Sequence, residues 1–502
     1  MLASTSRSPP GICRTKETRT EFNTRRQTTR LGSAPADGGM HVIYWIAAGP
    51  QVRSRLRNTP LPMDANSSEP DLRKRWTRIL PAVFITYSFA YLDRANYGFG
   101  AAAGLAQTLH ISEYRSALLG ALFFLGYALP QVPGIILVRQ YSARLLIFGA
   151  LVTWGAFAAL TGVIRTFWLL ALDRMLLGVA ESFVFPALLI VLTRWFTRAE
   201  RSRANSLMIL ANPVTVLWMS AVTGFLIRAW GWQRAFIIEG LVAVVWGGFW
   251  LALMRDHPAE SRWLSGTARA KLEGSLDIEQ LLLPQIANFW AAFREHNVVR
   301  LCINYFFWSL GIYGFVLWLP VVIRNATKTG MGTTGLIAAA PYLVAVVVMV
   351  VVSHFSDRRG QRKKYVWPLL MLGGLALAGS YFSVDRSFPV AYACLIVSAS
   401  CMYAPYGPFW AAVPELLPRN VAGETMALIN CVGALGGFFG TYFVRMLQVF
   451  TGSSAVGFLL MSLSLIVAGG VLLGMKPLPR VEAEGVAESN SQRVNYEANR
   501  SR

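Results

Sequence analysis

Four of the ionisable residues that interrupt apolar segments of the sequence define the chemistry open to this protein. Asp93 and Arg94 lie in one such segment, and Arg174 and Glu181 lie in another, which Asp173 also interrupts. A charged side chain at the centre of a membrane helix costs about 2.5–3.5 kcal/mol, so charged groups there commonly mark a functional site. Buried acids can bind and release protons, and arginines bind carboxylates through charge-assisted hydrogen bonds.

The spacing of Arg174 and Glu181 predicts that they share one face of a helix. Seven positions separate them, which is close to two helical turns. Glu181 lies near the middle of its segment among small and apolar residues, where desolvation favours the protonated carboxyl. The sequence therefore predicts a proton-binding role for Glu181. The alternative is that the four charged groups form a fixed ion-pair network that holds helices together.

Two further charged residues are interpreted as structural. Glu239 lies near the start of its apolar segment, where it is expected to face Arg234 or Trp232. Arg445 lies near the outer end of another segment, and its long side chain can reach the membrane interface.

The elements that position these residues are predicted to be membrane-spanning helices. Hydrophobic residues make up 54% of the 502 residues and charged residues only 15%, whereas soluble domains carry about 25% charged residues. A helix needs about 20 apolar residues to cross roughly 30 Å of hydrocarbon, and runs of that length recur here. The sequence predicts an all-α membrane protein with twelve spans, at residues 79–102, 114–138, 143–164, 167–192, 204–228, 234–254, 299–323, 332–355, 365–384, 389–413, 422–447 and 453–475.

A long polar interval, residues 255–300, divides the spans into two sets of six. Two similar six-helix bundles on a long central loop are typical of transporters whose binding site lies between two pseudo-symmetric halves. The predicted organisation is a basic, unstructured leader over 1–78 with an alternative start at Met63, bundles over 79–255 and 299–476, a central loop over 256–298 and an unstructured tail over 477–502.

The distribution of the net charge of +21 argues against a nucleic-acid-binding protein. Residues 1–62 hold ten Lys and Arg against three acids, and other basic residues cluster in short loops such as 357–364. Basic loops on one side of a membrane protein follow the positive-inside rule. This pattern places loop 357–364 and both termini in the cytoplasm, and we expect a multi-pass protein of the bacterial inner membrane.

The sequence shows no pattern of catalytic or metal-binding residues. Its five cysteines have no CxxC spacing, and its five histidines form no pair at metal-ligand spacing. We therefore expect a protein that is not an enzyme and has no metal or cofactor. Its expected partners are a small organic anion, protons and the lipid bilayer, and it is expected to be a monomer.

Amide and aromatic side chains replace charges in the spans of the second half. Such groups can hydrogen-bond hydroxyls and stack on a sugar-like backbone. The candidate substrate contacts of this kind are Tyr305, Trp308, Tyr313, Tyr403 and Asn430, with Tyr91, Tyr127 and Asn212 in the first half.

Glycine and proline mark where helices pack closely or break. The run Gly433, Gly436, Gly437 and Gly440 follows no strand, so it predicts close helix packing and not a phosphate loop. Prolines at Asn212–Pro213 and Pro405 predict broken or bent helices.

The loop SHFSDRRGQRKK, residues 353–364, resembles the cytoplasmic loop signature of the major facilitator superfamily. The resemblance covers residues 72–476 and implies its two-bundle fold, with a gating role for this loop. The matching residues are Asp357, Arg358, Gly360 and Arg362. The corresponding loop of the first half has Arg139 where an aspartate is usual, so the resemblance is weaker there.

The segments YLDRANYGF (91–99), RMLLGVAES (174–182) and FIIEGL (236–241) are similar to the anion:cation symporter family of that superfamily. The segments MYAPYGPFWAAVPE (402–415) and NVAGETMALIN (420–430) look closest to bacterial L-rhamnonate transporters. The resemblance implies that Asp93 and Glu181 bind protons, that Arg94 binds the substrate carboxylate, and that Arg174 is part of the same site.

The expected function is proton-coupled symport of an organic monoanion, a sugar acid such as L-rhamnonate or another aldonate, by alternating access. Two alternatives stay open at this point. One is the same fold carrying tartrate, nicotinate or aromatic acids, and the other is a proton-driven exporter.

Overall fold

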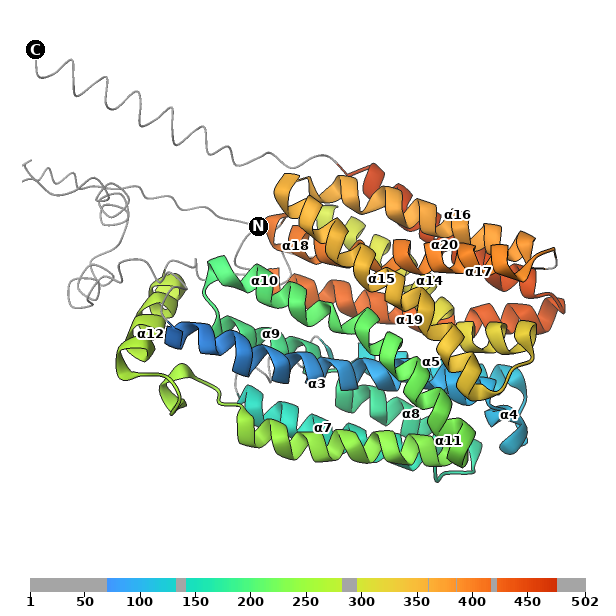
Figure 1. Cartoon of the computed structure of the whole chain (residues 1–502), viewed down its shortest axis with the longest axis horizontal. Coiled ribbons are helices and arrows are strands. Elements are labelled where there is room, and N and C mark those ends of the chain that lie inside the picture. The colour runs from blue at the N-terminus through green and yellow to red at the C-terminus, as the bar shows by residue number, and fades with distance from the viewer. Residues whose placement is uncertain are drawn as a thin grey trace, which may run out of the picture. The chain divides into compact units, whose positions relative to one another are not determined.

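The computed structural model describes residues 70–131, 141–281, 296–359, 361–384, 386–416 and 422–475. Within these ranges every regular element is a helix, and long helices run side by side (Figure 1). Helices satisfy their own backbone N–H and C=O groups, which lipid cannot do. The predicted all-α membrane fold is confirmed. The predicted unstructured leader is wrong over residues 70–78, which are helical, and the rest of the leader and the predicted tail lie outside the described residues.

The described residues of the first half form eight helices, and a loop region follows them. The helices are α3 (Pro70–Ala102), α4 (Leu105–Thr108), α5 (Glu113–Ala128), α7 (Ala143–Thr161), α8 (Phe167–Glu181), α9 (Val184–Trp195), α10 (Arg198–Ile209) and α11 (Ala211–Leu253). The loop region that follows contains η2 (Pro258–Glu260) and α12 (Gly266–Leu281).

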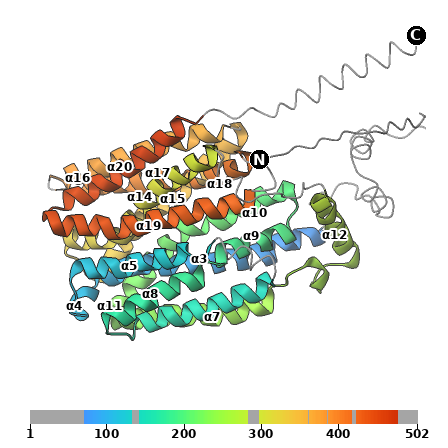
Figure 2. The ribbon, with the colours of Figure 1, turned by 180° about the vertical axis from the view of Figure 1, so that it is seen from behind.

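The second half supplies the remaining elements. These are α14 (His296–Thr327), α15 (Met331–Arg359), η3 (Arg362–Tyr365), α16 (Trp367–Ser383), α17 (Phe388–Tyr403), α18 (Tyr406–Leu416), α19 (Ala422–Thr451) and α20 (Ser454–Leu473). Seen from the front and from behind, α14 to α20 gather on one side, and α3, α5, α7, α8 and α9 gather on the other (Figure 2).

Nine helical stretches of the described chain are long and apolar enough to cross a bilayer. One of them, Arg203–Leu253, has 51 residues and would measure about 77 Å as a single helix, far more than the roughly 30 Å of hydrocarbon. Gly231, with φ 79°, breaks it into two spans. With the more polar α3 and the sixteen-residue α5, these stretches account for the twelve predicted spans in the described part of the chain.

The predicted helix breaks and the close helix packing are confirmed. Asn212 lies at the start of α11, and Pro405 separates α17 from α18. A Cβ atom added to Gly436 or Gly440 would collide with backbone carbonyl oxygens of α14, so these glycines allow α19 and α14 to touch. Gly126 and Gly178 do the same for α5 and α8.

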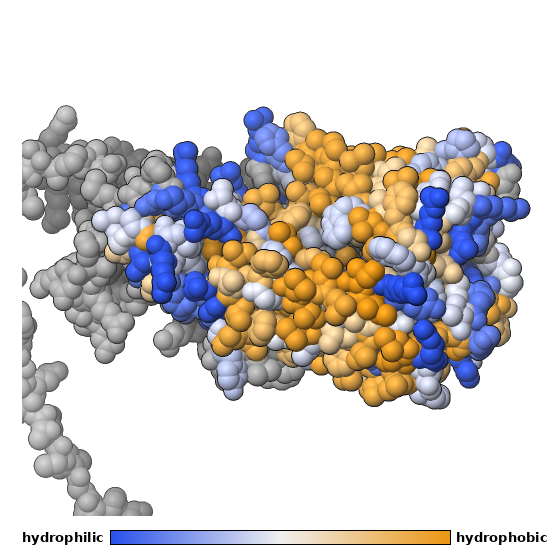
Figure 3. Space-filling model, turned by 60° about the horizontal axis from the view of Figure 1, so that its bottom comes forward, coloured by the Kyte–Doolittle hydropathy of each residue, from blue (hydrophilic) through white to orange (hydrophobic). Residues whose placement is uncertain are grey.

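The outer surface of the helices is apolar, as a membrane protein requires. Trp168 on α8 is 76% exposed, and Val245 on α11 and Leu375 on α16 are each 60% exposed. Figure 3 shows hydrophobic side chains over the middle of one face, with hydrophilic ones toward its ends. Lipid would cover this apolar surface.

Candidate functional site

A small cavity lies where helices of the two halves meet. Its volume of about 10 Å³ is close to the room that one water molecule needs. The lining residues are Arg94, Phe124 and Tyr127 from the first half and Tyr305, Ser309, Tyr313, Asn430, Gly433 and Ala434 from the second. The two halves are therefore closed around this point in the structure.

Arg94 and Glu181 form a buried ion pair at the cavity. Arg94 donates from Nη2 and Nε to Glu181 Oε1, at 2.5 and 2.8 Å. The two side chains are 5% and 0% exposed. The guanidinium also lies 4.2 Å from the centroid of the Tyr127 ring, and its Nη1 lies 3.3 Å from the Tyr313 hydroxyl. A cation and an acid thus share one low-dielectric site, where charged hydrogen bonds are strong.

Glu181 sits at a helix discontinuity that leaves one of its oxygens available. It is the last residue of α8, and α9 begins at Val184. Among the described residues, its Oε2 atom has no hydrogen-bond partner. Gly178, one turn earlier, brings α8 against the backbone of α5 at Phe123, which sets how close Glu181 comes to the cavity.

Arg174 is buried away from the cavity lining. Its guanidinium lies over the rings of Tyr97 and Phe123, at 4.9 and 5.6 Å from the ring centroids. Arg94 lies 6.0 Å from the centroid of the same Phe123 ring, which both cations therefore approach. The structure brings Arg174 near the acids Asp93 and Glu181 electrostatically but not into the cavity, so its role as a substrate contact stays a prediction.

Asp93 is also buried outside the cavity lining. The amide of Asn96 lies 3.4 Å from Asp93 Oδ1. The negative charges of Glu181 and Glu239 and the positive charge of Arg174 all act on it. Asp93 is therefore coupled to the ion pair through space and not through a direct contact.

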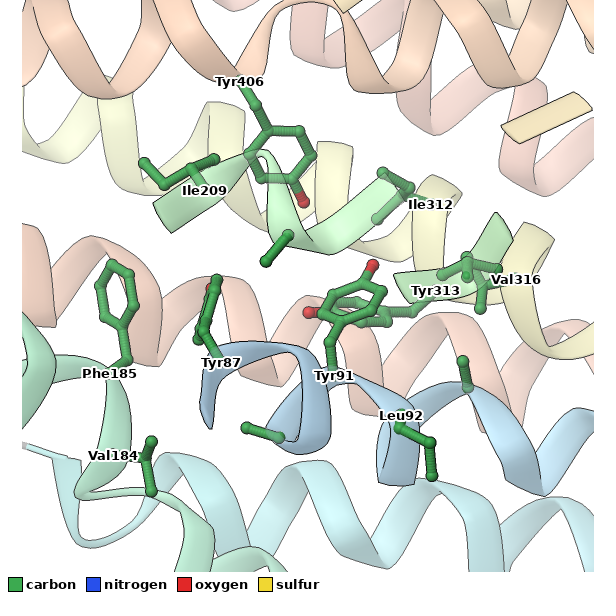
Figure 4. Packing of buried hydrophobic residues seen from close by; sticks show 14 of the residues in the cluster. Tyr87, Tyr91, Leu92, Val184, Phe185, Ile209, Ile312, Tyr313, Val316 and Tyr406 are labelled. Atoms are coloured by element: carbon green, nitrogen blue, oxygen red, sulfur yellow. The ribbon is translucent and has the colours of Figure 1, made fainter. Parts of the chain in front are cut away.

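Tyrosines join the two halves beside the ion pair. The hydroxyls of Tyr91 and Tyr403 are 3.1 Å apart. Figure 4 shows Tyr91 next to Tyr313, with ring centroids 6.3 Å apart. Asn430 Nδ2 lies 3.3 Å from the Tyr127 hydroxyl and donates to Gln131 Oε1 at 3.1 Å.

The remaining predicted contacts divide into one that lines the cavity and two that do not. Tyr305 lines it and stacks on Phe409, with ring centroids 5.4 Å apart. Trp308 instead donates its Nε1 hydrogen to the Met402 carbonyl at 3.0 Å and packs on Tyr406, which is a structural role. Asn212 is 3% exposed and is not a lining residue.

The predicted gating loop is only partly described. Asp357 and the exposed Arg358 belong to the end of α15, Arg362 begins η3, and Gly360 lies outside the described residues. Lys363, which follows Arg362, donates to the carbonyl oxygens of Leu473, the last residue of α20, and of Met475 just beyond it.

Several ion pairs were missed by the sequence reasoning, among them Arg75–Glu200 at 3.0 Å and the two that follow. Asp256, beyond α11, accepts hydrogen bonds from Arg194 at 3.1 Å, from the Arg144 amide and from the Ser142 hydroxyl. Arg445 pairs with Glu113 at 3.3 Å instead of only reaching toward the interface, so it joins α19 to α5. Both pairs link residues far apart in sequence, and no local pattern signals them.

The described residues contain no group of three side chains that could hold a metal ion.

Comparisons with known proteins agree with this architecture. A chain titled "D-xylose-proton symporter" superposes with a TM-score of 0.64 at 14% sequence identity, covering 80% of this chain and 98% of that one. A "Putative tartrate transporter" of Agrobacterium vitis is 32% identical over 77% of this chain and 87% of its own length.

Two further similar proteins are also named as transporters. The "Quinolone resistance transporter" of Acinetobacter baumannii is 29% identical over 83% of this chain and 96% of its own length. The "Inner membrane transport protein RhmT" of Escherichia coli is 26% identical over 81% and 95%. The model of the Major Facilitator Superfamily matches residues 83–441. The chain therefore belongs to the major facilitator superfamily and is a secondary transporter of the membrane, not an enzyme.

Proposed function

We propose that this transporter is a proton-coupled symporter of the anion:cation symporter family that imports an organic monoanion. The proposed substrate is a sugar acid such as L-rhamnonate or another aldonate. The observation that carries the proposal is the buried Arg94–Glu181 pair beside a cavity at the junction of the two halves. The proposed location is the bacterial inner membrane, with both termini in the cytoplasm.

The ion pair supplies a mechanism for coupling. A substrate carboxylate that enters the cavity competes with Glu181 for the Arg94 guanidinium. A proton that binds Glu181 removes its charge and leaves Arg94 with an unpaired charge, which an anion can satisfy. Proton and anion therefore favour each other's binding, and linkage requires this effect to be reciprocal.

Release follows from the same two states. When the cavity opens to the cytoplasm and Glu181 loses its proton, the Glu181 carboxylate competes again for Arg94 and displaces the substrate anion. The present cavity is too small for a sugar acid, so the halves have to separate on one side to admit it, as alternating access requires.

The membrane potential explains why the anion needs protons. A monoanion that enters an inside-negative cell is opposed by about 2.3 kcal/mol per 100 mV. One proton cancels this opposition, and a second makes the potential a driving force. Asp93 is the proposed second proton site, because it is buried and the charges of Glu181 and Arg174 act on it.

The polar groups around the cavity support a hydroxylated substrate. Ser309 lines the cavity, is 1% exposed, and has no hydrogen-bond partner for its hydroxyl among the described residues. The Nε2 atom of Gln131, beside Asn430, also lacks one there. An unpaired buried polar group costs about 1–3 kcal/mol, which hydrogen bonds from substrate hydroxyls would offset.

Uptake into proteoliposomes tests the proposal. Under an inward proton gradient, vesicles should accumulate labelled L-rhamnonate, and unlabelled aldonates should compete more strongly than tartrate. L-Rhamnose is a matched neutral control that lacks the carboxylate and should not compete. Stronger competition by nicotinate would favour an aromatic acid, since Phe124, Tyr127 and Tyr313 line the cavity. Proton-driven movement of a quinolone out of cells would favour the exporter that the name of one relative suggests.

A further inference from the structure

Glu239 is a buried acid that the mechanism above does not use. It lies on α11, is 6% exposed, and binds Thr223 Oγ1 through Oε1 at 2.5 Å. Its Oε2 atom accepts from Asn96 Nδ2 at 2.9 Å. It faces neither of its expected partners, because Arg234 is exposed and Trp232 donates to Thr108. Its hydrogen-bond partners in the described chain are thus neutral.

The same amide connects Glu239 to Asp93. Asn96 Nδ2 lies 2.9 Å from Glu239 and 3.4 Å from Asp93 Oδ1, so two buried acids of different helices share one donor. The Oδ1 atom of Asn96 is buried and has no donor among the described residues. The donors to this cluster are the Thr223 hydroxyl, the Asn96 amide and the Trp154 indole N–H that acts on Asp93. Their hydrogens are fewer than the carboxylate and amide oxygens that accept, and a carboxyl proton would supply the missing donor.

The surroundings of Glu239 contain few other charges. From α3 it faces Asp93, and α7 brings the backbone of Gly155 and Ala159 against Gly240 beside it. On α11 itself, Arg228 and Arg234 are exposed. Of the charged groups of α8, which also include Asp173, Glu181 and Arg174 act on Asp93.

We propose that Glu239 is a third proton-binding residue of this transporter, connected to Asp93 through Asn96 and remote from the substrate cavity. The inference rests on the proposed proton coupling. Two ionised carboxylates on one amide, with no cation of the described chain bonded to either, repel each other strongly in a low-dielectric interior. The pair therefore holds at least one proton.

The cluster also has a route by which it responds to the cavity. The charge of Glu181 acts on Asp93, so a proton that binds or leaves Glu181 changes how readily Asp93 is ionised. Asp93 and Glu239 repel each other, so this change reaches Glu239. A proton can then be held in the first half without occupying the space that the substrate needs.

Infrared difference spectroscopy between acidic and alkaline buffer tests the proposal on the full-length protein in lipid vesicles, with no substrate added. Wild type should show a protonated-carboxyl band that is lost on alkalinisation, and Glu239→Gln should lose one component of it. Glu260→Gln removes an exposed acid and should leave the band unchanged. Glu239→Asp retains a carboxyl and should retain a shifted component, which keeps the test usable if Glu239→Gln folds poorly.

A Glu239→Gln band that superimposes on the wild-type band overturns the proposal, as does a Glu239→Asp component that is absent. Transport in the same vesicles separates this result from the proposed function. If wild type accumulates none of L-rhamnonate, tartrate and nicotinate under a proton gradient, proton-coupled uptake fails, and the titration of Glu239 is judged on the spectra alone.

Discussion

At the scale of single residues, the proposed mechanism depends on the guanidinium of Arg94, for which the Glu181 carboxylate and a substrate carboxylate would compete. Arg94 binds Glu181 through two nitrogens, and both side chains are buried. Removing one partner of a buried ion pair costs about 3–5 kcal/mol, because it leaves a charge without compensation. Under the proposed function, Arg94 would have two favourable states, one paired with ionised Glu181 and one paired with a substrate anion after Glu181 has taken up a proton.

Replacing the arginine should remove anion binding. Arg94→Ala should lower the affinity for L-rhamnonate by about a hundredfold or more, the equivalent of roughly 3 kcal/mol. Arg94→Lys should recover only part of it, because lysine is a point charge and not a planar fork. Isothermal calorimetry on purified protein measures this, with Arg228→Ala as a control at an exposed arginine. Equal affinities in Arg94→Ala and wild type would refute the assignment.

Replacing the acid should separate binding from accumulation. Glu181→Gln mimics the protonated side chain, so Arg94 stays available to the anion at every pH. The variant should bind and exchange L-rhamnonate with little dependence on pH, but should not concentrate it under an inward proton gradient. Counterflow and gradient-driven uptake in the same vesicles measure the two activities, with Glu260→Gln as the control. Gradient-driven accumulation at the wild-type level would move the coupling role to Asp93.

Contact between α5 and α8 fixes the position of the ion pair at the scale of elements. Gly126 and Gly178 lie where the two helices touch, and a Cβ atom on either would collide with a backbone carbonyl oxygen. Glu181 lies less than one turn beyond Gly178, and Tyr127 adjoins Gly126. The glycines therefore decide how far the acid on α8 lies from the aromatic ring under Arg94.

A larger residue at this contact should disturb both stability and function. Gly178→Val should destabilise the protein by about 1–3 kcal/mol, because neither backbone can yield without moving a helix. Gly149→Ala is a matched control, since a Cβ atom there meets nothing within 4 Å. Thermal unfolding in detergent should show a lower midpoint for Gly178→Val and an unchanged or higher one for Gly149→Ala. Equal midpoints would show that the contact is looser than the structure indicates.

At the scale of the whole molecule, contacts between the first half and the second half hold the protein in a closed state. The Arg445–Glu113 pair joins α19 to α5, and the Tyr91 and Tyr403 hydroxyls join α3 to α17 near the cavity. Phe185 on α9 and Trp410 on α18 lie 5.8 Å apart between ring centroids. When one half moves against the other to open the cavity on one side, the contacts on that side have to break while those on the opposite side remain.

Breaking the Arg445–Glu113 pair should favour opening on its side. Its side chains are 25% and 41% exposed, so the pair contributes only about 0–1 kcal/mol and the effect should be at most severalfold. Thr441 lies on α19, where it is buried against Gly120 of α5. A cysteine at this position reports opening through its rate of maleimide labelling in a cysteine-free background. Glu113→Gln should speed labelling, and the charge swap Glu113→Arg with Arg445→Glu should restore the slower rate. An unchanged rate in Glu113→Gln would show that the pair does not hold the halves together.

The class of protein and its order of helices could be predicted from the sequence alone. Membrane insertion depends on local hydropathy, which the residues of each segment determine by themselves. Charged residues within such segments are rare, so they indicate a candidate site. Residue type and position along the chain are therefore sufficient to single out Asp93, Arg94 and Glu181 as candidate site residues, and the structure buries all three. Glycine at 436 and 440 indicates close packing in the same way, because small residues have that effect in any membrane helix.

Which side chains of different helices contact each other could be decided only by the tertiary structure. Helical spacing placed Arg174 and Glu181 on one face of α8, yet Glu181 pairs with Arg94, 87 positions away, while Arg174 lies over Tyr97 and Phe123. Glu239 likewise finds Asn96 and Thr223, and not its sequence neighbours. Periodicity fixes the direction of a side chain about its own helix, whereas the neighbour it meets depends on how separate helices pack.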